Sequence, residues 1–253
     1  MMNPLDLTGK TVMVTGASKG IGRATAIYLS RLGARIAAVA RNAEQLTETL
    51  SLAEGWNHHA VPFDLAEVEK IPGWMKEVVQ TTGPLYGLVH SAGIVFNRPL
   101  KVLSYKNITD MQRINVDAAI LLTKGFKQNG VYDKSGSSIV YLSSTAALKG
   151  KPALAAYSAT KGALVSLART LAVELAPDHV RVNCLCPGLV RTQMADELND
   201  ILPQDNLEKL EEEYPLGIGS PDDVAYAAAF LLSPAARWIT GTALVLDGGY
   251  TAA

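Results

Sequence analysis

The sequence predicts a single α/β domain covering residues 1–253, with a doubly wound sheet of seven parallel strands and helices on both faces. Short β-branched runs alternate with longer helical patterns along the whole chain, which is typical of parallel strands joined by crossover helices. No internal repeat or low-complexity linker divides the chain. With 253 residues, 48% of them hydrophobic, it can bury one large core.

Each element follows from its local pattern. Strands are expected at residues 11–15, 34–40, 58–63, 85–91, 138–142, 180–186 and 243–246, where the chain is apolar and largely β-branched. Helices are expected at 21–32, 43–52, 68–81 and 156–175, with a further helical region around 110–128. Pro72 would lie in or near a first helical turn, where its missing N–H costs little. Residues 193–213 are polar and acidic with interspersed leucines, which predicts an amphipathic helix broken at Pro203.

Charge and composition argue against several classes of protein. A net charge of −1 gives no electrostatic basis for binding nucleic acid or an anionic membrane, so neither partner is expected. Residues 1–10 hold no apolar run of signal-peptide length, and no stretch of about 18 apolar residues occurs, so we expect a cytoplasmic protein. Cys184 and Cys186 are expected to be buried free thiols rather than a metal site or a redox pair.

Tyr157 and Lys161 stand four residues apart in the predicted helix 156–175. Positions i and i+4 lie on one face of a helix, so both side chains can serve one site. A phenol titrates at about 10 in water, and acid/base work at neutral pH requires a fixed positive charge that stabilises the phenolate. Ser144 stands thirteen residues before Tyr157, at the end of an apolar run. Taken alone, the Tyr-x-x-x-Lys spacing is common, and it equally fits a core tyrosine and a solvated lysine.

The first strand-to-helix turn is rich in glycine, because residues 15–22 read Thr-Gly-Ala-Ser-Lys-Gly-Ile-Gly. Glycines between a strand and a helix allow a tight bend, close approach of a pyrophosphate and tight helix packing. The helix N-terminus then presents free N–H groups to the phosphates. The spacing is G-x-x-x-G-x-G, and its position directly after the first strand favours a dinucleotide site.

Several motifs together resemble the classical short-chain dehydrogenases/reductases over essentially the whole chain. Their joint order and spacing carry the resemblance, and they are Thr15 to Gly22, Asp64, His90 to Gly93, Asn115, Ser144, Tyr157, Lys161 and Pro187-Gly188. The extended members of that family use a differently spaced glycine turn and fit less well. The resemblance implies a Rossmann-type fold and an oxidoreductase that interconverts a carbonyl and a secondary alcohol.

The resemblance also implies a catalytic tetrad of Asn115, Ser144, Tyr157 and Lys161. Tyr157 would exchange a proton with the substrate oxygen, and Lys161 would lower the pKa of Tyr157 and hold the nicotinamide ribose. Ser144 would hydrogen-bond the carbonyl oxygen. Asn115 would kink its helix and hold a water for a proton relay to Lys161. The rival interpretation is a non-catalytic, dinucleotide-binding regulatory protein, which would be expected to lack one of the four.

A set of cofactor contacts follows from the same resemblance. Asp64 resembles the aspartate that contacts adenine, and a helix N-cap is its compatible alternative role. The usual Asn-Asn-Ala-Gly tetrapeptide is replaced here by residues 90–93, His-Ser-Ala-Gly, and we expect His90 to be a satisfied core histidine. The expected contacts are Gly16, Ser18, Lys19, Gly20, Ile21, Gly22, Arg41, Asp64, Leu65, Ala92, Gly93, Asn115, Tyr157, Lys161, Pro187, Gly188, Val190 and Thr192.

The end of the second strand predicts the cofactor. NAD-specific enzymes of this fold usually carry Asp or Glu there, whose carboxylate binds the ribose hydroxyls and repels a 2′-phosphate. In this chain Ala40 occupies that position, Arg41 follows it, and Lys19 adds a second cation from the glycine turn. A guanidinium can bind phosphate oxygens bidentately. We therefore predict NADP(H) over NAD(H), used for carbonyl reduction.

Substrate, lid and assembly are predicted mainly from the resemblance. The chain is similar to 3-oxoacyl-thioester reductases, and equally to generic ketone reductases and to sugar-alcohol or steroid dehydrogenases. Carrier-protein reductases tend to place a basic residue where this chain has Val173, which weakens that assignment. Residues 193–215 would form a substrate lid. The helical regions 110–128 and 156–175 are rich in apolar and small residues and would pair across two-fold axes in a homotetramer.

Overall fold

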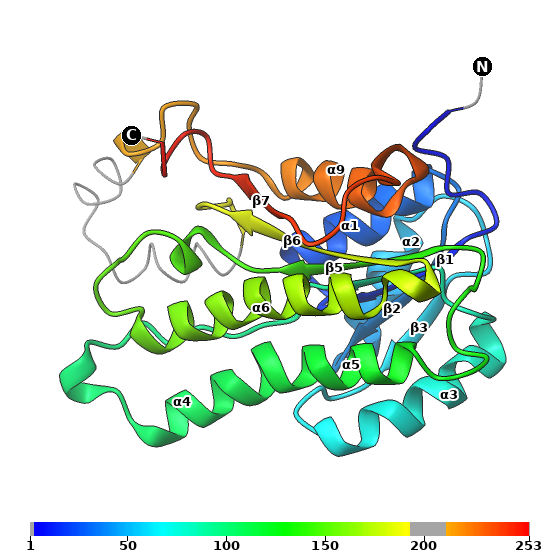
Figure 1. Ribbon diagram of the computed structural model, residues 1–253, viewed down its shortest axis with the longest axis horizontal. Coiled ribbons are helices and arrows are strands. Elements are labelled where there is room, and N and C mark those ends of the chain that lie inside the picture. The colour runs from blue at the N-terminus through cyan, green and yellow to red at the C-terminus, as the bar shows by residue number, and fades with distance from the viewer. Residues whose placement is uncertain (1–2, 193–210, 253) are drawn as a thin grey trace.

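The computed structural model describes residues 3–192 and 211–252, and one sheet of parallel strands lies at their centre (Figure 1). Its seven strands run in the order β3-β2-β1-β4-β5-β6-β7, and every neighbouring pair is parallel. The predicted sheet is therefore confirmed. Its strands are β1 Thr11–Thr15, β2 Arg35–Ala40, β3 His59–Pro62, β4 Gly87–His90, β5 Ser137–Leu142, β6 Val180–Pro187 and β7 Ala243–Leu246.

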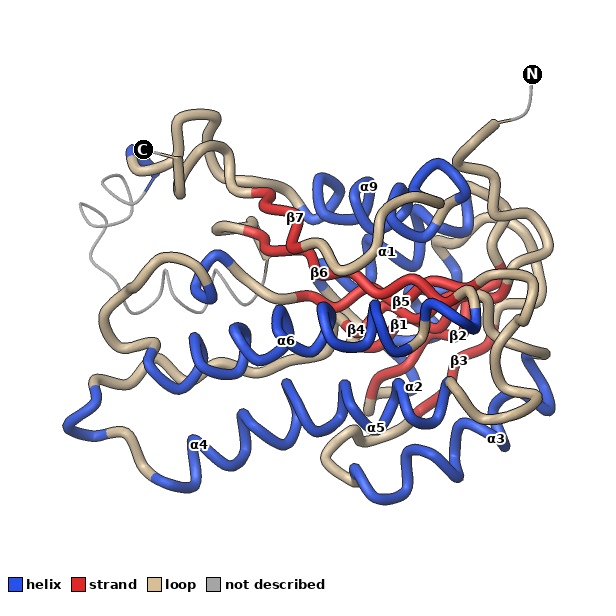
Figure 2. The backbone as a smooth tube through the Cα atoms, viewed as in Figure 1, coloured by secondary structure: helices blue, strands red, loops and turns tan. Residues whose placement is uncertain are grey.

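Helices cover both faces of this sheet, and Figure 2 shows the strands running between two helical layers. One layer holds α1 Gly20–Arg31, α2 Ala43–Ser51 and α9 Pro221–Leu232, and the other holds α3 Ile71–Thr82, α5 Ala118–Phe126 and α6 Ala155–Glu174. Side chains alternate between the layers along each strand. Val12 and Val14 pack with the α1 and α9 layer, whereas Met13 packs with the α3, α5 and α6 layer.

Short helical turns and α4 complete the described chain. The 3₁₀ turns are Val68–Lys70, Leu100–Val102, Thr145–Ala147, Ala176–Asp178 and Pro234–Ala236. The predicted helix 68–81 therefore begins as a 3₁₀ turn, and Pro72 lies in the first turn of α3 as expected. Helix α4, Tyr105–Gln112, passes through a π-helical segment, Arg113–Asp117, into α5. Asn115, which was expected to kink its helix, lies in this π-helical segment.

Helix α9 is an element that the sequence interpretation above omitted. Its start carries a capping box: Ser220 accepts the N–H of Asp223, and the Asp223 side chain accepts the N–H of Ser220. Pro221 at the first helical position adds a further start signal. The helix buries alanines and leucines against β5 and α1. This cap motif is a signal from which the helix could have been found.

The sheet order places a topological switch point between β1 and β4. From β1 the chain proceeds to β2 and β3 on one side, and then returns to β4 on the other. In open parallel sheets a crevice opens at this point, outside the carboxyl ends of the strands. Within the described residues, no helix is long and apolar enough to cross a membrane. Most of the predicted lid, residues 193–210, lies outside the described residues.

Candidate active site

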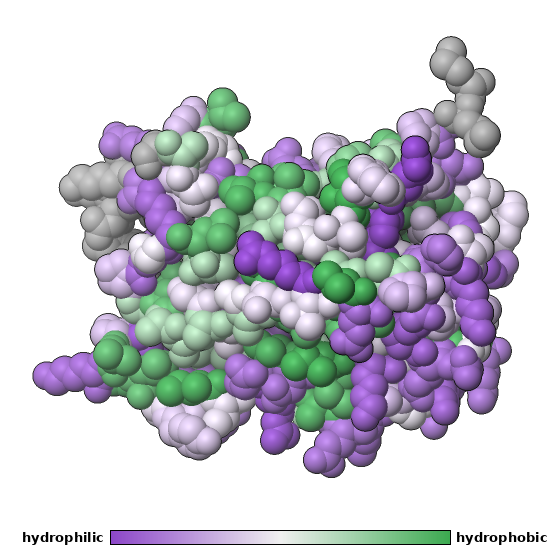
Figure 3. Space-filling view, viewed as in Figure 1, coloured by the Kyte–Doolittle hydropathy of each residue, from purple (hydrophilic) through white to green (hydrophobic). Residues whose placement is uncertain are grey.

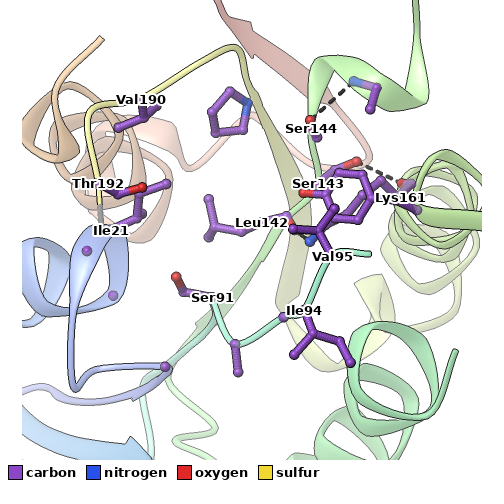
Figure 4. Close-up of a pocket in the computed structure, with 18 of the residues that line it drawn as sticks. Ile21, Ser91, Ile94, Val95, Leu142, Ser143, Ser144, Lys161, Val190 and Thr192 are labelled. Atoms are coloured by element: carbon purple, nitrogen blue, oxygen red, sulfur yellow. Dashed lines mark hydrogen bonds between the residues drawn. The ribbon is translucent and has the colours of Figure 1, made fainter. Parts of the chain in front are cut away.

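A cavity of about 1170 Å³ opens at the carboxyl ends of the strands. Gly16, at the end of β1, and Tyr157, in α6, both line it, so they lie at the same end of the sheet. In Figure 4 Ser143, Ser144 and Lys161 occupy one side of this cavity, and Ile21, Val190 and Thr192 occupy the other. The catalytic candidates therefore face the glycine turn across one space.

The glycine turn is shaped by very close backbone contacts. Gly16 has φ +70°, and a Cβ added to it would lie 2.9 Å from the backbone nitrogen of Ala92. A Cβ on Gly22 would lie 2.3 Å from the carbonyl oxygen of Gly16. Only glycine fits where backbone packs so closely. The turn at the end of β1 thus packs directly against the loop after β4, and both border the cavity.

Ser144 and Tyr157 lie together at the β5 side. The Ser144 Oγ accepts the N–H of Ala146 at 3.2 Å and so caps the 3₁₀ turn that follows β5. The same hydroxyl interacts with Tyr157 and acts to lower its pKa, but burial has the larger effect and raises the pKa of Tyr157 to about 12. The phenol is therefore protonated at neutral pH.

Lys161 is buried beside Tyr157. Its Nζ donates a hydrogen bond to the Leu142 carbonyl oxygen at 2.7 Å and lies 5.5 Å from the centroid of the Tyr157 ring. Burial lowers the pKa of Lys161 to about 8. Its ammonium was predicted to lower the pKa of Tyr157. The net pKa of Tyr157 is nevertheless raised, because desolvation of the phenol has the larger effect, and the effect of Lys161 stays a prediction.

Asn115 lies behind the cavity rather than in its wall. Its Oδ1 accepts the N–H of Ile94 at 2.8 Å, and its Nδ2 donates to the Ile94 carbonyl oxygen and to Thr160 Oγ1, each at 3.0 Å. The side-chain amide thus joins the loop after β4 to α6. A Cβ on Gly93 would lie 3.1 Å from Asn115 Oδ1 and 3.4 Å from Lys161 Nζ, so the two candidates are neighbours.

The other predicted cofactor contacts come together in the same cavity. Asp64 follows β3, where its Oδ1 accepts the N–H of Ala66 at 2.9 Å, so it caps a turn rather than a helix. The lining includes Gly16, Ser18, Lys19, Gly20, Ile21, Gly22, Arg41, Asp64, Leu65, Ala92, Gly93, Tyr157, Lys161, Pro187, Gly188, Val190 and Thr192. Of the expected contacts, Asn115 is the exception.

His90 is buried at the end of β4, as expected of a core histidine, but only half of its ring is satisfied. Its Nδ1 lies 3.0 Å from Thr15 Oγ1, while its Nε2 has no hydrogen-bond partner among the described residues. Burial, together with the nearby Lys161 charge, lowers the pKa of His90 to about 3, so the ring is neutral. Cys184 and Cys186 are buried and free, as predicted.

Comparison with known proteins places this arrangement in a family. Residues 16–251 match the family model described as enoyl-(acyl carrier protein) reductase. The chain belongs to the short-chain dehydrogenase/reductase family. The family resemblance predicted from the motifs is thereby confirmed.

Relatives of this short-chain dehydrogenase/reductase span nearly its whole length. A 3-oxoacyl-[acyl-carrier-protein] reductase of Mus musculus is 35% identical over 241 residues, which is 95% of this chain and 97% of the relative. The crystal structure of a dehydrogenase/reductase from Sinorhizobium meliloti has a TM-score of 0.89 and 32% identity, covering 98% of this chain and 97% of that one. A gluconate 5-dehydrogenase from Burkholderia cenocepacia, in complex with NADP and tartrate, has a TM-score of 0.90 and 27% identity, with 99% and 98% coverage.

The structure adds site residues that the motifs did not indicate. At the β5 side the cavity of this short-chain dehydrogenase/reductase is lined by Arg98, Lys149, Lys151, Tyr214 and Tyr250, among others. Lys149 and Lys151 follow Ser144 closely in the chain, and that proximity was an available signal. Tyr214 and Tyr250 lie far from any motif in the sequence, and their rings stack with centroids 4.7 Å apart. Their place in the wall follows only from the folded chain.

Proposed function

We propose that this short-chain dehydrogenase/reductase is an NADP(H)-dependent oxidoreductase that interconverts a carbonyl and a secondary alcohol. One observation carries the proposal: Ser144, Tyr157 and Lys161 open into the same cavity as the glycine turn. A proton donor and a dinucleotide cradle therefore share one space. The alternative, a binding protein without turnover, gains no support from the site, because all four tetrad residues are present.

The β1 side of the cavity fits a dinucleotide. Gly16 and Gly22 lack the Cβ atoms that would collide with neighbouring backbone, which leaves the turn compact and open to a pyrophosphate. The first turn of α1 directs its N–H groups toward that space. The proposed cofactor, when bound, supplies or accepts the hydride. Asp64 and Leu65 would lie at its adenine end, and Pro187, Gly188, Val190 and Thr192 would wall its nicotinamide end.

The chain's own residues supply the proton. With a pKa of about 12, Tyr157 holds its proton at neutral pH and would donate it to the substrate oxygen during reduction. Ser144 would orient that oxygen through its hydroxyl. Lys161, with a pKa of about 8, is mainly protonated at pH 7, and its charge would favour loss of the phenolic proton. Asn115 would keep the loop after β4 hydrogen-bonded to α6.

Three residues at the ends of β1 and β2 support NADP(H) as the cofactor. Ala40 leaves the end of β2 without a carboxylate that would repel a 2′-phosphate, and Arg41 and Lys19 line the cavity beside it. The gluconate 5-dehydrogenase that shares this fold was solved with NADP, which agrees with this choice. The 3-oxoacyl-[acyl-carrier-protein] reductase relative supports a 3-oxoacyl thioester as one candidate substrate.

Assembly into a homotetramer is a second part of the proposal. Apolar side chains lie exposed along α4, α5 and the preceding turn, and Figure 3 shows them gathered along that side of the molecule. They are Leu100, Val102, Tyr105, Ile108 and Ile120. Contiguous exposed apolar surface is typical of an interface. Light scattering at micromolar protein tests this, and a monomer mass independent of concentration would reject it.

The direct test of the activity is NADPH consumption by the purified chain. A saturating diketone and an acetoacetyl thioester are suitable first substrates. We expect NADPH oxidation that depends on the carbonyl compound. A protein that binds NADPH in a direct titration and yet consumes none with a broad panel of carbonyls would instead be a binding protein.

A further inference from the structure

The substrate side of the cavity is positively charged. Three cations lie there, Arg98, Lys149 and Lys151, whereas the one acid that lines the cavity among the described residues is Asp64, after β3 at the far side of the sheet. None of the three cations forms an ion pair with any residue in the described part of the chain. Among the described residues, this side of the cavity thus presents positive charge without a counter-ion.

Two carboxylates, Asp247 and Glu213, lie near the three cations but do not neutralise them. Asp247 accepts the N–H and the hydroxyl of Thr251 at 2.8 and 2.6 Å, so its oxygens are already hydrogen-bonded. Glu213 is exposed and acts on the Tyr250 ring through its charge. Neither carboxylate lines the cavity. The cations therefore face a space in which an anion would be favoured.

Lys149 is held in a defined position. Its backbone N–H donates to the Thr145 carbonyl oxygen at 2.9 Å, which continues the turn that Ser144 caps. Its Nζ donates to the Tyr250 carbonyl oxygen at 2.8 Å and lies 4.0 Å from the centroid of the Tyr250 ring. An ammonium has three donors, so two remain for a ligand. Because a 3₁₀ turn rises about 2 Å per residue, the backbone of Lys149 stays within roughly 10 Å of Ser144.

The segments that carry Arg98 and Lys151 are joined to each other. The backbone N–H of Arg98 donates to the Ala153 carbonyl oxygen at 2.9 Å. Ala153 has φ +66°, a left-handed conformation that costs energy for a residue with a Cβ and persists where the surroundings impose it. Two exposed cations are thereby placed on one rim, with the half-buried Lys149 deeper in the cavity.

We propose that this cavity selects carbonyl substrates that carry an anionic group, either a carboxylate or a phosphate, at a short distance from the reacting carbon. Lys149 binds the anion, Arg98 and Lys151 attract it at the rim, and the carbonyl lies against Ser144 and Tyr157. This inference rests on the proposed function and specifies its substrate class. It disfavours uncharged apolar ketones, such as steroids, as preferred substrates.

The test compares matched pairs that differ in one charge. Acetoacetate and levulinate are each assayed against their methyl esters at saturating NADPH. We expect kcat/KM to favour the acid over its ester by about tenfold or more in at least one pair, since hydrogen bonds to charged groups are the stronger ones. Dihydroxyacetone phosphate against dihydroxyacetone, a pair that differs in one phosphate close to the carbonyl, tests the phosphate in the same way. The pair that shows the preference identifies the anion.

Single substitutions identify the cation that causes the preference for the acid over its ester. Lys149→Met is expected to reduce the ratio of kcat/KM for the acid to kcat/KM for its ester to about twofold or less. Lys149→Arg should restore this ratio because the charge returns. Arg98→Gln and Lys151→Gln should each reduce it by a smaller factor, because exposed charges are screened. Lys101→Gln is the matched control: Lys101 is exposed, three residues after Arg98, and does not line the cavity. The acid-to-ester kcat/KM ratio and the activity of Lys101→Gln should equal those of the unmodified protein.

The outcomes separate this inference from the proposed function. Turnover of the neutral compounds with the same kcat/KM as the charged ones would overturn anion selection and leave the proposed oxidoreductase activity standing. A preference that survives in all three cation variants would equally overturn it. If no carbonyl compound is turned over, calorimetric titration with levulinate and with its methyl ester, in the presence of NADP⁺, still tests anion selection through the two binding affinities. Tighter binding of the acid, lost in Lys149→Met, supports the inference, and equal binding rejects it.

Discussion

The two sides of the cavity are built in different ways. On the β1 side the wall is mostly backbone and small residues. They pack so closely that a Cβ added to Gly22 would lie 2.3 Å from the Gly16 carbonyl oxygen. These residues are neighbours in sequence, within one turn of the chain. On the β5 side the wall consists of long side chains, such as Lys149, Tyr214 and Tyr250, from segments far apart in sequence. One side is fixed by local geometry and the other by tertiary packing.

This difference suggests a division of labour. A wall of backbone can accept only one shape, which suits a cofactor that is the same in every turnover. A wall of side chains can change by substitution without disturbing the sheet, which suits a substrate that differs among relatives. Substitutions on the two sides should therefore affect different kinetic constants, and the following experiments test that expectation.

Replacing the proposed proton donor should have the largest effect. In Tyr157→Phe the ring stays, but the hydroxyl between Ser144 and the substrate oxygen is lost, so kcat should fall by about a thousandfold or more. NADPH affinity, measured by fluorescence titration, should change by less than about threefold, because the cofactor side is untouched. Retention of more than about a tenth of kcat, a barrier increase under roughly 1.4 kcal/mol, would mean that another group transfers the proton.

Gly22→Ala tests the cofactor side. The added Cβ would lie 2.3 Å from the Gly16 carbonyl oxygen and 3.1 Å from the Ala17 nitrogen, so the turn must shift. We expect NADPH affinity to fall by about a hundredfold, since the shifted backbone no longer fits the phosphates. Gly162→Ala in α6 is the matched control and should bind NADPH normally, because among the described residues the added Cβ would meet no atom of another segment or side chain within 4 Å. Equal affinities in both variants would show that the turn does not cradle the cofactor.

Arg41→Ala tests cofactor choice. Loss of the guanidinium should raise KM for NADPH by about tenfold and leave KM for NADH nearly unchanged, because only NADPH carries the 2′-phosphate. The unmodified protein should have the higher kcat/KM with NADPH. An equal value for the two cofactors, or a higher one with NADH, would contradict the assignment of Ala40, Arg41 and Lys19 to phosphate recognition.

A pH profile tests the charge of Lys161. Its pKa of about 8 means that the ammonium is present below pH 8 and is lost as the pH rises through that value. The profile of kcat/KM for NADPH reports ionisations of the free protein, so it should be flat from pH 6 to about 7.5 and fall by roughly tenfold per unit above pH 8. Tyr157, with a pKa of about 12, titrates outside this range. A flat profile up to pH 10 would remove Lys161 charge from the mechanism.

The sequence predicted one side of the cavity far better than the other, for a physical reason. The sheet and the glycine turn follow from strand pattern and short spacings, which are local properties. The Ser144, Tyr157 and Lys161 group was predicted through the family resemblance. The raised pKa of Tyr157 could not be predicted from the sequence, because desolvation depends on everything packed around the ring. Tyr214 and Tyr250 were not found, because no local pattern brings their segments together.

His90 lies on the border between the two sides, and its replacement should have the smallest effect. Thr15 Oγ1 already accepts the N–H of Ala92 at 3.2 Å, so its own proton is available to His90 Nδ1 at 3.0 Å. His90→Asn keeps an acceptor there, and removing the unpaired Nε2 offsets the lost packing, so kcat should stay within about threefold and stability within about 1 kcal/mol. His90→Leu instead leaves the buried Thr15 hydroxyl without that acceptor and should lower the free energy of unfolding, measured in urea, by about 1–3 kcal/mol.

Equal stability of the Asn and Leu variants would show that the Thr15 hydrogen bond contributes nothing. A large loss of kcat in His90→Asn, with stability unchanged, would instead assign His90 a direct part in positioning Asn115 for catalysis.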